Sequence, residues 1–153
     1  MMVLDTNVVS ETMAKQPDQG VIRFLDALEE RAAVTVITVA EIRYGIAVLP
    51  AGARKRNLTA SSERVFAALG SAGVLPFDEP AASDYANIAA ARRQAGKPIS
   101  QADAIIAAIC RHHEVALATR SVDDFAGTGI VVVNPWDMPR GAGGPDLPDL
   151  PGR

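Results

Sequence analysis

The chain opens with Met1-Met2-Val3-Leu4-Asp5-Thr6-Asn7-Val8, in which a short apolar run stops at an acidic residue. The run predicts a buried strand, because large apolar and β-branched side chains favour the interior of a sheet. Asp5 stands where the next strand residue would enter the core, although aspartate is disfavoured in strands. Thr6 and Asn7 predict a polar turn into a short helix, so Asp5 is either a functional acid or the N-cap of that helix.

The rest of the chain repeats this alternation of apolar runs and amphipathic segments. Further strands are expected at residues 33–37, 74–76, 115–119 and 130–133, and further helices at residues 21–28, 39–50, 53–69, 80–96 and 100–113. Such alternation is typical of an α/β fold with helices on both faces of a parallel sheet, here of about five strands. We expect one domain over residues 1–138, followed by a disordered Gly/Pro-rich tail at residues 139–153.

Composition and charge exclude several classes of protein. A chain of 153 residues that is 48% hydrophobic and 22% charged is typical of a soluble globular domain. No apolar run approaches the ~18 residues that span a bilayer, and the single cysteine, Cys110, excludes an internal disulfide. The N-terminus does not resemble a signal peptide, which predicts a cytoplasmic protein. The net charge of −3 argues against sequence-independent binding of duplex nucleic acid.

Carboxylates follow several of the expected strands, at the edge of a parallel sheet where functional groups collect. Asp5 ends the first strand, Glu41 follows the second, and Asp103 opens a later helix. A structural interpretation competes for each: Thr38-x-x-Glu41 has the pattern of a capping box, and Ser100-x-x-Asp103 is close to one. Asp123 and Asp124 after the fourth strand are likewise typical of a turn.

Taken together, three acids from distant segments favour a shared site. Carboxylates ~4 Å apart repel by about 4 kcal/mol at an effective dielectric constant of ~20, so a cation is needed to keep them ionised. Ligation by oxygen alone selects a hard ion, Mg²⁺ or Mn²⁺. These ions favour phosphate chemistry, in which they bridge phosphoryl oxygens and activate water.

Several segments, in this order and at these intervals, resemble the motifs of PIN-domain ribonucleases, and in particular the VapC and FitB toxins of bacterial type II toxin–antitoxin pairs. They are residues 2–8, 38–45, 75–78, 101–107, 118–125 and 133–136. The resemblance implies a PIN-like three-layer sandwich and a Mg²⁺-dependent endoribonuclease. It places Asp5, Glu41 and Asp103 at the first three acidic positions of the family, as catalytic and metal-binding residues.

The fourth acidic position of the family falls on Ser121, where this sequence departs from the pattern. A serine can hydrogen-bond a metal-bound water but cannot contribute a full charge. Asp123 or Asp124 could compensate, or metal binding is weaker in this chain than in its relatives. Thr6 and Asn7 have short polar side chains that could orient Asp5 or a bound water.

The resemblance also implies partners. It predicts an RNA substrate, a homodimer, and an antitoxin whose C-terminal segment brings a basic residue into the acidic pocket; with the antitoxin, a DNA-binding hetero-oligomer is expected, and no membrane. Arg43 and Arg120 are candidates for steering the RNA backbone.

Two alternative functions remain open at this point. One is a PIN module that lost activity with its fourth acid and now acts by binding a partner or DNA. The other is a haloacid-dehalogenase-like phosphatase, with Asp5 as nucleophile, Lys97 as charge clamp and Asp123 with Asp124 as metal ligands. Against the phosphatase, Asn7 occupies the position where that family has a second aspartate.

Overall fold

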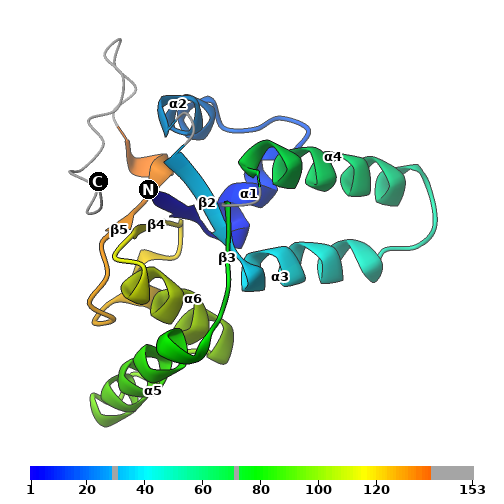
Figure 1. The fold of residues 1–153 in the computed structure, drawn as a ribbon. Coiled ribbons are helices and arrows are strands. Elements are labelled where there is room, and N and C mark those ends of the chain that lie inside the picture. Colours follow the sequence, from blue (N-terminus) through cyan, green and yellow to red (C-terminus); the bar gives the residue numbers. More distant parts are fainter. Residues whose placement is uncertain (29–30, 71–72, 139–153) are drawn as a thin grey trace.

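The computed structural model describes residues 1–28, 31–70 and 73–138, which form a sheet flanked by helices (Figure 1). In chain order the elements are β1 (Met2–Leu4), α1 (Thr6–Thr12), α2 (Gln19–Leu28), β2 (Ala32–Thr35), α3 (Val36–Ala47), α4 (Ala53–Leu69), β3 (Val74–Leu75), α5 (Glu79–Gln94), α6 (Gln101–His112), β4 (Ala116–Ala118), the 3₁₀ helix η3 (Val122–Phe125), β5 (Val132–Val133) and the 3₁₀ helix η4 (Pro135–Asp137). The expected tail, residues 139–153, lies outside the described residues.

The sheet has five strands in the order β3-β2-β1-β4-β5, and all neighbouring pairs are parallel. The central strand is β1, in which Met2 lies beside Ala32 of β2 and Ala116 of β4. Because the strands are parallel, the segments that follow β1, β2 and β4 all leave from one edge of the sheet. The predicted α/β class and parallel five-stranded sheet are therefore confirmed.

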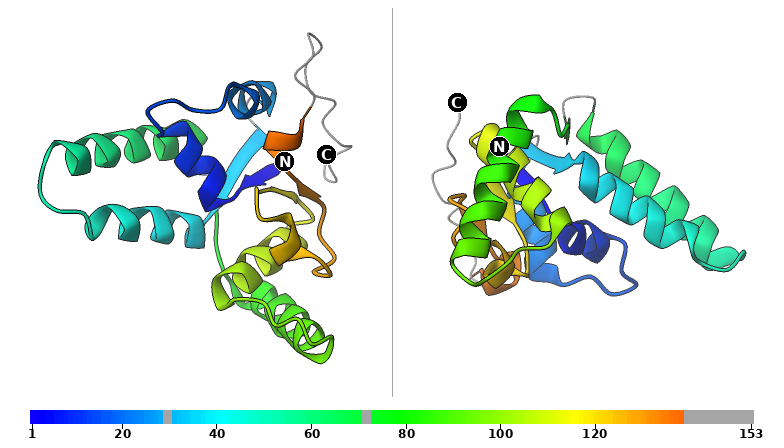
Figure 2. Two further views of the ribbon diagram at one scale, coloured as in Figure 1. Left: turned by 180° about the vertical axis from the view of Figure 1, so that it is seen from behind. Right: turned by 90° about the horizontal axis from the view of Figure 1, so that it is seen from below.

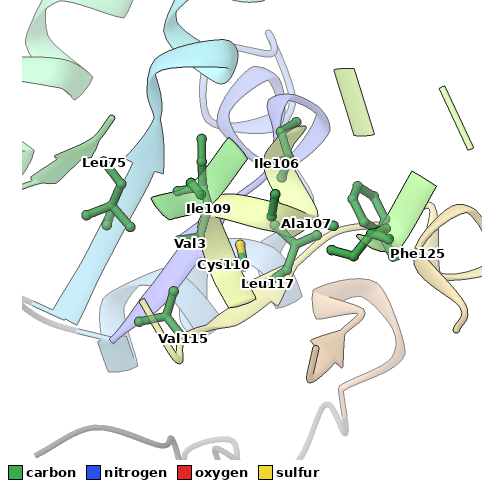
Figure 3. Close-up of a cluster of buried hydrophobic side chains, with 13 residues drawn as sticks. Val3, Leu75, Ile106, Ala107, Ile109, Cys110, Val115, Leu117 and Phe125 are labelled. Carbon is green, nitrogen blue, oxygen red and sulfur yellow. The ribbon is translucent and has the colours of Figure 1, made fainter. Parts of the chain in front are cut away.

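Side chains of β1 alternate between two hydrophobic clusters, one on each face of the sheet. Val3 belongs to the cluster under α5 and α6, which includes Ile106, Leu117 and the buried Cys110 (Figure 3). Met2 and Leu4 face the opposite cluster, to which α1 and α2 contribute Val8, Val9, Phe24 and Leu28. Burial on both faces explains why the strands read as continuous apolar runs.

Helices α3 and α4 pack against each other and project from the sheet as a pair (Figures 1 and 2). Lys55 at the start of α4 holds the connection, since its ammonium group donates to the carbonyls of Ala47 (2.6 Å) and Leu49 (3.2 Å). This contact gives Lys55 a structural role. No helix in the described part of the chain is long and apolar enough to cross a membrane.

The prediction of a strand over residues 33–37 is wrong at its C-terminal end. The strand stops at Thr35, whose hydroxyl accepts a hydrogen bond from the main-chain N–H of Thr38 (3.1 Å) and so caps α3. Val36 and Ile37 are β-branched yet lie in the helix, because the N-cap and tertiary packing outweigh their strand propensity. Glu41 consequently lies in the second turn of α3, and its interpretation as half of a capping box with Thr38 is also wrong.

The core on the α2 face predicts that replacing two different phenylalanines with alanine will lower the free energy of unfolding by very different amounts. Phe24 is fully buried there, whereas Phe77 is 37% exposed and meets Tyr85 edge-on. Phe24→Ala should lower the free energy of unfolding by about 3–5 kcal/mol, through lost burial and the cavity that it leaves. Phe77→Ala, the matched control, should cost about 1 kcal/mol. Urea denaturation measures both, and equal losses would contradict the assignment of Phe24 to the core.

Candidate active site

Asp5 is the central residue of the site and is held at the junction between β1 and α1. The residue is only 7% exposed, and its main-chain N–H still belongs to the sheet, donating to the carbonyl of Ala118 (3.0 Å). The carboxylate accepts hydrogen bonds from the Thr6 main-chain N–H (2.7 Å), the Asn7 side-chain amide (2.9 Å) and the Thr119 hydroxyl (2.6 Å). The N-cap interpretation is thus confirmed, but capping occupies only one of the two carboxylate oxygens.

Thr119 is a site residue that the candidates from sequence did not include. It is fully buried directly after β4, and its hydroxyl accepts from the Asn7 side-chain amide and from the Ser121 main-chain N–H (both 3.0 Å) while donating to Asp5. Its position after β4 matches that of Asp5 after β1. This equivalent place at the end of a neighbouring strand is the signal that could have identified it.

Glu41 and Asp103 reach the same edge of the sheet from α3 and α6. The Glu41 carboxylate accepts a hydrogen bond from the Thr6 hydroxyl, which links it to the residue next to Asp5. The Asp103 carboxylate accepts a hydrogen bond from the Ser100 hydroxyl (2.6 Å), and the main-chain N–H of Asp103 donates to the hydroxyl oxygen of Ser100 (3.1 Å). Ser100 is therefore the N-cap of α6, as the sequence indicated, and the carboxylate of Asp103 is bound to that cap.

Burial raises the pKa of Asp5 above its ordinary value, because the charged carboxylate is removed from water. The hydrogen bonds from Thr119 and Thr6 act in the opposite direction and lower the pKa. The negative charges of Asp103 and Glu41 raise it further. The three acids are thus close enough to interact electrostatically. A positive charge between them would offset both the cost of burying the ionised Asp5 carboxylate and the repulsion among the three carboxylates.

The donor chemistry fits a hard divalent cation, because the acids offer carboxylate oxygens and no nitrogen or sulfur. Coordination by all three at once is not preformed: within residues 1–28, 31–70 and 73–138, no three His, Cys, Asp or Glu side chains are grouped closely enough to hold a metal ion. Thr6 and Ser100 each bind one of the outer carboxylates. The residues therefore fit such an ion in charge and ligand type.

The remaining sequence candidates lie around this centre with different roles. Ser121 is half-buried and contacts Thr119 through its main chain, whereas Asp123 and Asp124 are exposed in η3. The main chain of these two acids forms the 3₁₀ turn, so their interpretation as turn residues is confirmed. Arg43 lies on α3, with its guanidinium 3.5 Å from the Glu63 carboxylate of α4 and over the Phe66 ring.

A groove lies beside Glu41, between α1, α3 and α4. Its first part, of about 450 Å³, is lined by Thr6, Ser10, Met13, Ala14, Glu41, Ile42, Gly45, Ile46, Leu49, Arg54 and Leu58. A second part, of about 630 Å³, shares Met13, Ala14, Arg54 and Leu58 and adds Lys15, Asn57 and Ser61. The groove therefore has a mostly apolar wall, with the Glu41 carboxylate in its first part, Lys15 in its second part and Arg54 lining both.

A family model described as the PIN domain matches residues 2–128 of this chain. The chain belongs to the PIN-domain family. Toxin FitB of Neisseria gonorrhoeae is similar to it, with 41% identity over 137 residues that cover 89% of this chain and 99% of the toxin. VapC ribonuclease Y4jK of Sinorhizobium fredii is 41% identical over 139 residues, which cover 90% of this chain and 99% of that protein.

A solved structure described as FitAB bound to an IR36 DNA fragment resembles this PIN domain with a TM-score of 0.84 and 39% identity, over 91% of this chain and 98% of that one. The family expected from the motifs is thus confirmed, together with the PIN-like sandwich. Membership in it removes the support for a haloacid-dehalogenase-like phosphatase.

The raised pKa of Asp5 predicts how the stability of this PIN domain varies with pH when no divalent cation is present. The carboxyl keeps its proton to a higher pH in the folded chain than in the unfolded chain, where its pKa is about 3.9. Between those two pKa values the folded state binds more protons, so the free energy of unfolding falls as the pH rises.

Asp5→Asn has no such titration, so the stability of the wild type relative to this variant should decrease as the pH rises through that interval. Urea unfolding of both proteins between about pH 3.5 and pH 7.5 measures the difference. A difference that stays constant, or that grows with pH, would contradict the burial and charge environment assigned to Asp5.

Proposed function

We propose that this PIN domain is the ribonuclease toxin of a type II toxin–antitoxin pair and that it hydrolyses RNA phosphodiester bonds with Mg²⁺, or alternatively Mn²⁺. The observation that carries the proposal is the buried Asp5 carboxylate, whose pKa is raised by burial and by the charges of Asp103 and Glu41. The ionised form of such a buried carboxyl group is disfavoured unless a cation lies beside it. The hard divalent cations that carboxylate oxygens bind are those used in phosphodiester hydrolysis. The naming of similar proteins as a toxin and a ribonuclease supports the same conclusion.

Each side chain has a separate task in this proposal. Asp5, fixed by Thr119, Asn7 and Thr6, would be the principal metal ligand. Asp103 and Glu41 would complete the site, Glu41 through a water, since its carboxylate already accepts from the Thr6 hydroxyl. A bound Mg²⁺ supplies Lewis-acid stabilisation of the phosphate and a water of lowered pKa.

Ser121 sets this chain apart from the acidic pattern of the family. Its main-chain N–H supports Thr119, and a hydroxyl there adds no charge to the site. Asp123 and Asp124 are exposed on η3, which makes them weak substitutes for a fourth ligand. We therefore propose that the resting site holds one ion and that the substrate phosphate contributes the missing oxygens for a second.

The groove along α1 fits a protein segment better than a bare RNA strand, because most of its wall is apolar. We propose that an antitoxin segment occupies it, with a basic residue near Glu41 and an acidic residue near Lys15 and Arg54. The toxin would act as a homodimer in the cytoplasm, where RNA and antitoxin are both present, and would bind DNA only together with the antitoxin.

A second candidate function is a PIN module that binds its partner without cleaving RNA. Two observations favour it. Ser121 stands at the position where the family pattern has its fourth acid, and the carboxylates of Glu41 and Asp103 already accept hydrogen bonds from the hydroxyls of Thr6 and Ser100. Under this alternative Asp103 serves only the start of α6, where asparagine would substitute well.

Metal-dependent cleavage and its loss in two variants separate these functions. The purified protein should cleave single-stranded RNA in Mg²⁺ and stop in excess EDTA, and Asp5→Asn and Asp103→Asn should each lower the rate by at least roughly a hundredfold. Asp26→Asn on the exposed face of α2 is the matched control and should cleave like the wild type. Cleavage is measured on a labelled RNA with thermal unfolding of each variant alongside.

Two outcomes would contradict the proposal. Cleavage that continues undiminished in EDTA would exclude the metal mechanism. Full activity in both Asp5→Asn and Asp103→Asn would leave these acids with structural roles alone, and folded wild-type protein with no cleavage of any RNA would favour the partner-binding module.

A further inference from the structure

Arg120 is held from two directions immediately beside the candidate active site. Its guanidinium lies 3.9 Å from the centre of the Trp136 ring, on η4, and 3.6 Å from the Glu11 carboxylate, on α1. Its main-chain N–H donates to the side-chain oxygen of Asn7 (3.2 Å), the residue whose amide binds both Asp5 and Thr119. One residue thus joins the segment after β4 to α1 and to η4.

The contacts with α1 have a definite geometry. Asn7 and Glu11 are four residues apart on a helix, so they lie on the same face, one turn from each other. Arg120 therefore contacts that face at two points, with its main chain at Asn7 and its side chain at Glu11. Two points of attachment restrain both the distance and the rotation of the helix relative to the end of β4.

The partners of Arg120 are themselves anchored. The second oxygen of Glu11 accepts from the main-chain N–H of Asp18 (2.7 Å), which fixes the loop between α1 and α2. Trp136 is half-buried against the core cluster on that face, and η4 packs against α2. A charge pair combined with stacking on a tryptophan is a geometry that arginine favours and that lysine does not reproduce.

We propose that Arg120 is a positioning residue: through Glu11 and Trp136 it fixes α1 against the end of β4 and thereby keeps Asn7 and Asp5 in place. This assigns it a different role from steering the RNA backbone, in which the guanidinium would act on substrate directly. The effect on catalysis rests on the ribonuclease activity proposed above, whereas the structural restraint exists with or without that activity.

Two variants test the restraint while leaving Arg120 itself intact. Glu11→Gln removes the charge pair but keeps a carbonyl oxygen for the N–H of Asp18, and Trp136→Leu removes the ring but keeps an apolar side chain. Each should lower kcat roughly three- to tenfold at an unchanged KM. Trp136→Phe, which retains an aromatic face, should restore most of the rate.

A spectroscopic readout accompanies the kinetics and requires no activity. Hydrogen exchange of the Arg120 main-chain N–H, followed by NMR in metal-free protein, should accelerate roughly three- to tenfold in Glu11→Gln and Trp136→Leu. Exchange should stay near the wild-type rate in Trp136→Phe. Arg111→Ala is the matched control, because this half-exposed arginine pairs with Asp84 (3.2 Å) between α5 and α6, away from the site.

The outcomes decide between the roles. A higher KM with unchanged kcat in Arg120→Ala, with Glu11→Gln and Trp136→Leu kinetically silent, would overturn the proposal and make Arg120 a substrate-binding residue. Unchanged exchange in Glu11→Gln and Trp136→Leu would overturn it as well, even if the wild type cleaved no RNA. If the wild type cleaves no RNA, the ribonuclease proposal fails, but accelerated exchange in Glu11→Gln and Trp136→Leu would still support the restraint.

Discussion

The buried carboxylate of Asp5 is the constraint on which the rest of the site depends. It occupies the junction of β1 and α1, where its main chain still belongs to the sheet while its side chain caps the helix. Burial and the neighbouring charges of Asp103 and Glu41 disfavour its ionised form, and the donors Thr6, Asn7 and Thr119 compensate in part. The segments after β1 and β4 supply the hydrogen-bond donors that hold this buried carboxylate in a fixed position.

The sequence was informative about this junction because every signal there is local. The apolar run before Asp5 and the polar residues after it predicted both the strand and the helix, and both are present. The capping hydroxyl of Ser100 was likewise predicted from residues three apart. The α/β class followed from the alternation of segments, which the parallel sheet confirms.

Features that depend on long-range packing were harder to predict. Thr119 contacts Asp5 across 114 positions of sequence. Its place directly after β4 is a signal from sequence, but only the pairing of β1 with β4 brings its hydroxyl to that acid. The β-branched side chains of residues 36–37 predict that β2 continues there, but the cap at Thr35 starts a helix instead. The stacking of Arg120 on Trp136 joins two segments whose contact only the folded chain creates.

We propose that Asp5 and Asp103, with Glu41 acting through a water, form the site for a divalent cation. Paramagnetic Mn²⁺ tests it most directly, because Mn²⁺ prefers the same oxygen ligands and broadens the NMR signals of nearby nuclei. Substoichiometric Mn²⁺ should broaden the amide signals of Asp5, Glu41 and Asp103 first, and added Mg²⁺ should reverse the effect. Broadening centred on Asp123 and Asp124, or none at any of these acids, would contradict the account.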